Sequence, residues 1–197
     1  MRRSLAKPHP QVIGVDDGAF DRDDRYAPIA AVVLTLPEHV EAVRTGRVRV
    51  DGTDGTRRVV ALVRGLGSLE GARAVLLDGA VVGGFNVLDL TTLHRELGLP
   101  VVAVTRRPPE FSRIRAALRK WFPRTARTRW ELLRAHRLFR VPTGGKPILA
   151  AAVGCSRADA ARLVEHATVR GYWPEPVRLA HLVASAGRRQ HPRAPKD

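Results

Sequence analysis

Apolar runs in this chain end abruptly in acidic residues at two places. Residues 12–15 (VIGV) are followed by Asp16 and Asp17, and residues 74–77 (AVLL) are followed by Asp78. Uninterrupted apolar runs of this length, bounded by turn residues, predict strands that are buried in a sheet. If these two strands are neighbours, their terminal carboxylates emerge side by side at one edge of that sheet.

The rest of the pattern predicts a mixed α/β sheet. Residues 29–36 are apolar and β-branched, and residues 46–50 alternate arginine with valine, so with the first run they suggest three consecutive antiparallel strands. Residues 74–78 and 100–105 are apolar strands separated by a helical pattern, which favours parallel pairing with both faces covered. We further expect a strand at 147–153 and helices at 59–66, 89–97, 111–122 and 130–137, from 156 and from 176. This order is typical of a ribonuclease H-like sheet, three antiparallel strands and then parallel strands, flanked by helices.

The chain of 197 residues fits one domain of ordinary size, and its 44% of hydrophobic residues suffices for a core. We expect a folded domain over residues 11–187, between a basic N-terminal arm at 1–10 and a basic tail at 188–197, both rich in arginine and proline. Cys155 is the single cysteine and has no partner for an intramolecular disulfide, and no membrane span or secretory signal is recognisable. The sequence therefore predicts a cytoplasmic protein.

The charge balance is strongly basic. Lys and Arg total 34 against 19 Asp and Glu, a formal net charge of +15, which is typical of proteins that bind a polyanion. Almost all of these cations are arginines, so the codon bias of a GC-rich genome is the alternative explanation. Nucleic acid is the first partner to consider.

Three aspartates stand where core elements begin or end: Asp16, Asp54 ahead of the first helix, and Asp78. Carboxylates held close together repel one another unless a cation lies between them, and hard oxygen ligands suit Mg²⁺ or Mn²⁺. Such an ion can activate water and stabilise the oxygen displaced from a phosphodiester. The alternative is that these residues belong to ordinary turns after strands, with Asp54 capping the helix.

Four ordered motifs resemble one family, known as endonuclease dU because its studied members cut DNA at deoxyuridine, and related to endonuclease V. The motifs are IGVDDG at 13–18, VDGTD at 50–54, LDG at 77–79 with GGFNV at 83–87, and PEPVRLAH at 174–181. The resemblance covers residues 12–186, nearly the whole folded part. It implies a divalent-metal-dependent endonuclease that acts on DNA with a deaminated base, in a repair pathway.

The more distant resemblance to endonuclease V implies roles for individual residues. Asp16, Asp54 and Asp78 would hold Mg²⁺ or Mn²⁺, with Asp54 standing where that family has a glutamate. Arg106 would stabilise charge at the reacting phosphate, and His181 would act in the metal shell or in proton transfer. The strand-separating Pro-Tyr-Val-Pro segment of endonuclease V has no counterpart here, which puts hypoxanthine recognition in doubt.

Further residues are expected to contact nucleic acid. They are Asp17, an extra carboxylate of this branch; Asn86 in the glycine-rich segment; Arg106 and Arg107 after the strand at 100–105; and Arg178 in the last motif. Asn86 has an equal alternative, a tight loop that packs its neighbour Phe85 into the core.

Basic and aromatic residues concentrate between residues 113 and 130. The densest basic stretch could follow a DNA backbone or could simply be a solvated face; it comprises Arg113, Arg115, Arg119, Lys120, Arg124, Arg127 and Arg129. Each tryptophan (Trp121, Trp130 and Trp173) could stack on a flipped base, although packing in the core or at an interface is the commoner use.

Two other functions remain open on the sequence alone. A non-catalytic nucleic-acid-binding protein with the same fold would bind DNA or RNA in a salt-sensitive manner without metal, and a basic scaffold would show no strong affinity for nucleic acid. The substrate is expected to be DNA, with RNA as the alternative. The sequence predicts no oligomeric state.

Overall fold

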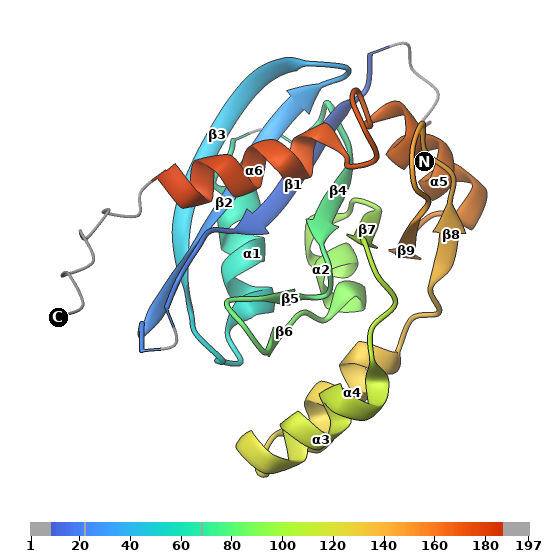
Figure 1. Ribbon diagram of the computed structural model, residues 1–197. Coiled ribbons are helices and arrows are strands. Elements are labelled where there is room, and N and C mark those ends of the chain that lie inside the picture. Colours follow the sequence, from blue (N-terminus) through green and yellow to red (C-terminus); the bar gives the residue numbers. More distant parts are fainter. Residues whose placement is uncertain (1–8, 22, 68, 187–197) are drawn as a thin grey trace, which may run out of the picture.

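The computed structural model describes residues 9–21, 23–67 and 69–186, and its main feature is a seven-stranded mixed sheet in the order β3-β2-β1-β4-β7-β9-β8 (Figure 1). The strands are β1 (Gln11–Asp17), β2 (Tyr26–Thr35), β3 (His39–Arg49), β4 (Ala72–Asp78), β7 (Val101–Thr105), β8 (Phe139–Val141) and β9 (Ile148–Val153). A separate two-stranded hairpin, β5 (Val81–Val82) and β6 (Asn86–Val87), carries the glycine-rich turn.

The predicted ribonuclease H-like arrangement is confirmed. Strands β1, β2 and β3 run antiparallel to one another, while β1, β4 and β7 are mutually parallel. One detail differs from the expectation of parallel strands at the end of the chain, because β9 pairs antiparallel with β7 and β8 antiparallel with β9. The apolar pattern of a fully buried strand does not encode its direction, and β5, β6 and β8 are too short to leave a pattern of their own.

The described residues form six helices: α1 (Gly55–Arg64), α2 (Leu90–Leu97), α3 (Phe111–Trp121), α4 (Ala126–Arg134), α5 (Arg157–His166) and α6 (Glu175–Ala186). The residues of β1 alternate between two apolar clusters, Ile13 and Val15 facing α1 and α2, and Val12 facing α5 and α6. Both faces of β1 are thus covered, which explains its unbroken apolar run.

Helix α6 crosses the sheet directly over β1 (Figure 1). Glycine allows this close approach, because a Cβ atom at Gly14 would lie 2.0 Å from the carbonyl oxygen of Pro176, and one at Gly18 would lie 2.5 Å from the backbone of Ala184. Two glycines of the first strand and turn therefore determine how closely α6 approaches the acidic end of β1.

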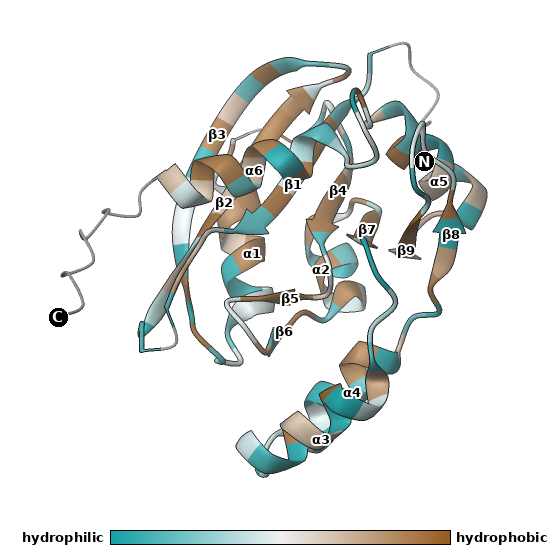
Figure 2. Ribbon diagram, in the orientation of Figure 1, coloured by the Kyte–Doolittle hydropathy of each residue, from teal (hydrophilic) through white to brown (hydrophobic). Residues whose placement is uncertain are grey.

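Helices α3 and α4 form a hairpin that projects from the body of the protein (Figure 1), and hydrophilic residues alternate with hydrophobic ones along it (Figure 2). Its base is fixed by Arg129, which is 5% exposed and donates to the carbonyl oxygens of Phe85 and Asp51 and to Thr125 Oγ1. The Phe85 ring also packs on Phe122, with 5.6 Å between ring centroids. The hairpin is thus attached to the β5-β6 turn.

The ends of the chain are only partly described. Residues 1–8 and 187–197 lie outside the described residues, as do most of the two expected basic arms. Residues 9 and 10, placed in the N-terminal arm by composition, bond instead to the backbone of Leu36. No helix among the described residues is long and apolar enough to cross a membrane.

Candidate active site

The acidic ends of β1 and β4 meet at one edge of the sheet. These strands pair in parallel, with Val15 opposite Leu77, so Asp16 and Asp78 follow at the same level. Asp16 is only 4% exposed, whereas Asp78 is half-buried. The structure thus brings together the two carboxylates that the apolar runs placed at strand ends.

The carboxylates in this cluster resist ionisation. Burial, together with the neighbouring charges of Asp78 and Asp17, raises the pKa of Asp16 to about 9 against the partial opposing effects of the Asp17 amide and of Arg106. Burial likewise raises the pKa of Asp78, although the Arg106 guanidinium lowers it in part. The pKa of Asp17 is also raised by burial, with the amide of Gly83 acting in the opposite direction. Three carboxyl groups therefore share a site in which their full ionisation is unfavourable without a cation.

Asp17 joins the cluster through the glycine-rich turn. Its Oδ2 accepts a hydrogen bond from the amide of Gly83, while its own amide donates to Asp16 Oδ1 at 2.8 Å. Gly83 has φ +54°, a conformation that glycine adopts without strain. The turn that follows Asp78 thus reaches back to the end of β1 and fixes the third carboxylate.

His181 approaches the cluster from α6. Its Nδ1 lies 3.0 Å from Asp16 Oδ2 and 3.0 Å from the carbonyl oxygen of Asp17. Because a carbonyl oxygen only accepts, Nδ1 must carry the proton in this bond, which leaves Nε2 as the nitrogen able to accept a proton. The side chain is 54% exposed, so Nε2 can exchange protons with water or substrate.

Arg106 completes the cluster from the end of β7. Its Nη1 lies 3.7 Å from Asp78 Oδ2, and its Cζ lies 3.8 Å from the centroid of the Trp173 ring. Trp173 is 7% exposed, so it is a buried platform that holds the guanidinium, and this placement does not favour stacking on a base. The role of Trp173 as a support was missed in the sequence, although it stands next to the PEPVRLAH motif.

The donor set of this cluster fits a hard divalent cation. Carboxylate oxygens are the ligands that Mg²⁺ and Mn²⁺ prefer, and a bound cation would offset the burial and the mutual repulsion that raise the pKa values of Asp16 and Asp78. In the part of the chain that the structure describes, no three His, Cys, Asp or Glu side chains already stand arranged as ligands of one ion. The fit to a divalent cation therefore rests on the chemistry of these carboxylates and not on a preformed set of ligands.

Asp54, predicted as a third metal ligand, lies in a different environment. It occupies the position before α1 without a capping hydrogen bond, and its carboxylate accepts from Asn86 Nδ2 at 2.8 Å and from Arg58 Nε at 3.1 Å. Burial raises the pKa of Asp54, but the hydrogen bonds from Asn86, Arg58 and the Arg49 amide outweigh burial and leave this pKa lowered. The charges that shift the pKa of Asp16 come from Asp78, Asp17 and Arg106, and Asp54 is not among them.

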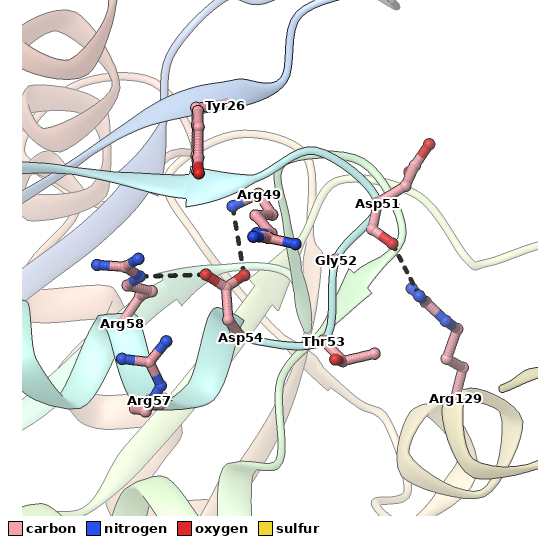
Figure 3. Close-up of a pocket in the computed structure, with 9 residues that line it drawn as sticks. All are labelled: Tyr26, Arg49, Asp51, Gly52, Thr53, Asp54, Arg57, Arg58 and Arg129. Atoms are coloured by element: carbon pink, nitrogen blue, oxygen red, sulfur yellow. Dashed lines mark hydrogen bonds and ion pairs between the residues drawn. The ribbon is translucent and has the colours of Figure 1, made fainter.

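Asp54 lines a neighbouring pocket of about 390 Å³ (Figure 3). This pocket opens at the same edge of the sheet, because Tyr26 at the start of β2 pairs with Arg49 at the end of β3. Its lining residues are Tyr26, Arg49, Asp51, Gly52, Thr53, Asp54, Arg57, Arg58 and Arg129. Several of their side chains are already engaged within the pocket wall, including Asp54 and Arg58, which face one another.

Asn86, predicted to contact nucleic acid, is fully buried. Its Oδ1 accepts from the amide of Gly55, and its Nδ2 donates to Asp54 and to the carbonyl of Arg49. Both of its polar groups are therefore occupied inside the protein, which leaves none to face a base or a phosphate. Asn86 instead joins the start of α1 to the β5-β6 hairpin.

The remaining predicted contacts are placed as follows. Arg107 is exposed, one residue beyond Arg106. Arg178 is engaged in a two-point ion pair with Glu175 on the first turn of α6. In the basic stretch, Arg129 is buried at the base of the α3-α4 hairpin, while its other members are exposed.

Replacing Asp54 by asparagine should destabilise the fold without affecting a metal at Asp16 and Asp78. One carboxylate oxygen that now faces Asn86 or Arg58 would become an amide donor, leaving a partly buried donor without an acceptor. We expect the free energy of unfolding of Asp54→Asn to fall by about 1–2 kcal/mol, measured by urea denaturation at pH 7. The loss should shrink as the pH falls below 3.8 toward the lowered pKa of Asp54, where the parent carboxyl group begins to take up a proton; a loss that does not change with pH over this range would contradict the lowered pKa.

Known proteins resemble this chain over nearly its whole length. A family model described as endonuclease dU matches residues 8–187. A UPF0215 protein of Thermococcus gammatolerans is 39% identical over 185 residues, which cover 91% of this chain and 93% of that protein. The crystal structure of a protein of unknown function from Archaeoglobus fulgidus superposes with a TM-score of 0.80 and 31% identity, over 90% of this chain and 97% of the other.

A more distant structure shares the fold. Endonuclease V of Ciona intestinalis, crystallised with a 24mer DNA containing an inosine followed by a ribo-adenosine, superposes with a TM-score of 0.58 and 17% identity. The match covers 88% of this chain and 83% of that one. At this identity the likeness establishes a common ribonuclease H-like fold.

Proposed function

Because the chain belongs to the endonuclease dU family, we propose that it is a divalent-metal-dependent endonuclease that cuts DNA near a deaminated base, with deoxyuridine as the substrate lesion. Family membership and the endonuclease V-like fold support a nuclease that acts in DNA repair. Dependence on a divalent metal and deoxyuridine as the lesion are proposed in addition to that nuclease activity.

One observation carries the proposal: the buried carboxylate of Asp16 and the half-buried carboxylate of Asp78 lie together at the ends of two parallel strands and resist ionisation. A purely structural site would gain nothing from crowding acids in this way, since their ionisation opposes folding. A divalent cation would satisfy them, and when bound it would supply activation of water and stabilisation of the charge on a displaced phosphate oxygen.

The chain's own residues supply the other requirements of phosphodiester cleavage. Arg106, held over the ring of Trp173, presents a guanidinium beside Asp78 that can bind a phosphate oxygen and stabilise charge developing on it. His181, with Nδ1 fixed by the carbonyl of Asp17, directs Nε2 outward as a group that accepts or delivers a proton. The net charge of +15 provides the attraction for the DNA backbone.

A cleavage assay tests the proposal. An end-labelled oligonucleotide with one deoxyuridine should be cut near that residue in the presence of Mg²⁺ or Mn²⁺, while the matched thymidine oligonucleotide should remain intact. Asp78→Asn should lower the cleavage rate by at least about a hundredfold, because it removes a charge that holds the metal and orients the phosphate. Asp23→Asn, a matched change of an exposed carboxyl group ahead of β2, should cut at the parental rate.

Other results would point elsewhere. Equal cutting by the parent and Asp78→Asn proteins would contradict the assignment of the site. Salt-sensitive DNA binding that persists in chelator, with no cleavage of any deaminated substrate, would instead favour a non-catalytic nucleic-acid-binding protein. If only a hypoxanthine oligonucleotide were cut, the protein would still be a nuclease, but its lesion would be hypoxanthine and not deoxyuridine.

A further inference from the structure

The α3-α4 hairpin carries a large aromatic side chain that the fold does not use. Trp121, the last residue of α3, is 65% exposed, the highest exposure among the large hydrophobic residues that the structure describes. The other tryptophans differ from it: Trp173 is buried beneath Arg106, and Trp130 packs edge-on against Phe111 with 5.8 Å between ring centroids. An indole left in water on a projecting element indicates a binding surface.

The surroundings of Trp121 are strongly basic. Between residues 110 and 134 the chain has eight arginines and lysines against two glutamates. Lys120 Nζ lies 4.7 Å from the centroid of the Trp121 ring. The exposed cations of the hairpin are Arg113, Arg115, Arg119, Lys120, Arg124, Arg127 and Arg134. Two of them, Arg113 and Arg127, pair with the glutamates, which leaves a net positive surface around the indole.

A cationic surface with an exposed aromatic ring matches the chemistry of single-stranded nucleic acid, in which phosphates bind to arginine and lysine and unstacked bases pack on aromatic rings. A protein partner with an acidic, apolar face would be the other chemistry to consider. The overall charge of the chain and the edge of the sheet to which the hairpin is attached favour nucleic acid.

The hairpin is attached to the site of the carboxylates by a short series of contacts. Arg129 and Phe122 hold Phe85, and two residues earlier in the same turn the amide of Gly83 holds the carboxylate of Asp17. A strand bound along the hairpin would therefore be held in a fixed relation to the acidic cluster, because one turn supports both.

We propose that the α3-α4 hairpin is a binding arm for single-stranded DNA, in which Trp121 stacks on an unpaired base and the surrounding cations bind the flanking phosphates. This inference rests on the proposed function for its biological setting, since it supplies the contact that holds the strand next to the site of cleavage. The recognition itself needs neither the metal nor the lesion.

The test separates binding from cleavage. An unmodified single-stranded oligonucleotide is titrated into the Asp78→Asn protein in the presence of EDTA, and binding is followed by tryptophan fluorescence and by anisotropy of a label on the DNA. Stacking should quench the fluorescence of Trp121, and Trp121→Ala should weaken binding to the single strand by about tenfold. Trp121→Phe, which retains an aromatic face, should recover most of the affinity. For a blunt duplex of the same length, whose bases are already stacked, Trp121→Ala should weaken binding much less than it does for the single strand.

Charge variants provide the matched controls. Lys120→Ala and Arg124→Ala should each reduce the slope of log affinity against log salt by about 0.7, because each removes one phosphate contact to a single strand. Trp121→Ala should leave that slope unchanged. Val43→Ala, which removes an exposed apolar side chain from β3, should bind as the parent does. Thermal melting of every variant confirms folding, which these exposed positions should not disturb.

Two outcomes would overturn the inference: Trp121→Ala binding the single strand as tightly as the parent, or Trp121→Ala abolishing a dimer in sedimentation with no change in DNA affinity. Failure of the proposed function is distinguishable from both. A protein that cuts no DNA with a deaminated base but loses single-strand binding on Trp121→Ala would refute the nuclease and keep the binding arm.

Discussion

Asp16→Asn should make the protein more stable in the absence of divalent metal and, at the same time, inactive. The reason lies in the raised pKa of Asp16, about 9 in the folded protein against an ordinary value of 3.8. Between these two pH values the folded protein holds a proton that the unfolded chain releases, so the free energy of unfolding falls as the pH rises. Asparagine keeps the acceptor for the Asp17 amide and removes the titrating group.

The expected gain in stability depends on pH. Each pKa unit corresponds to about 1.4 kcal/mol, and with relaxation of the site we expect Asp16→Asn to exceed the parent by about 2 kcal/mol or more at pH 8.5. Near pH 5 the difference should be much smaller. The loss of unfolding free energy builds up only above the ordinary pKa of 3.8, and pH 5 lies just above that value. Urea denaturation in EDTA at the two pH values measures this.

A control variant isolates the cause. Asp23→Asn changes an exposed carboxyl group and should alter the free energy of unfolding by less than about 0.5 kcal/mol at either pH. If Asp16→Asn were less stable than the parent at pH 8.5, the ionised Asp16 carboxyl group would not be destabilised by burial and by the neighbouring carboxylates as we infer. The accompanying loss of cleavage would follow from removal of a residue that we propose as a metal ligand.

Gly14→Ala should displace α6 and with it His181. An added Cβ would lie 2.0 Å from the carbonyl oxygen and 2.1 Å from the carbonyl carbon of Pro176, and neither backbone atom can rotate out of the way. The first turn of α6 must therefore move off β1 or the protein must unfold. We expect a loss of about 3 kcal/mol or more in the free energy of unfolding.

The matched control for this variant is Gly144→Ala, where the nearest atom to an added Cβ is the Gly171 carbonyl oxygen at 3.9 Å. Its stability should be close to that of the parent. For Gly14→Ala protein that still folds, cleavage should fall along with stability, since His181 loses its fixed position beside Asp16. Parental stability and activity in Gly14→Ala would show that α6 does not pack on β1 as described.

The sequence predicts the fold well because its strands are buried on both faces. Unbroken apolar runs locate β1, β4 and β7, and the carboxylates that follow β1 and β4 come together because parallel neighbours end at the same edge. The pattern of a strand that is apolar on both faces does not show whether the strand runs parallel or antiparallel to its neighbour. The antiparallel pairing of β9 could therefore not be predicted. The early start of β3 is hidden for another reason, since this edge strand is mostly exposed and has no apolar pattern.

The site is less predictable because long-range polar contacts leave no periodic signal. Asp54 falls in the right motif by order along the chain, yet Asn86 and Arg58 engage its carboxylate. Trp173 supports Arg106 across a gap of 67 positions in the chain, and nothing local indicates that contact. Asn86 illustrates the same limit, since a polar residue in a glycine-rich segment suggests exposure whereas this side chain is a buried link between α1 and the β5-β6 hairpin.

The central claim is that Asp16 and Asp78 form a divalent cation site, and titration of Mn²⁺ into the protein by calorimetry at pH 7.5 tests it most directly. We predict saturable binding that is weakened by at least about tenfold in both Asp16→Asn and Asp78→Asn. Asp54→Asn, whose carboxyl group lies outside the cluster, should bind Mn²⁺ as the parent does. Parental affinity in both Asp16→Asn and Asp78→Asn, or loss of binding in Asp54→Asn alone, would contradict the claim.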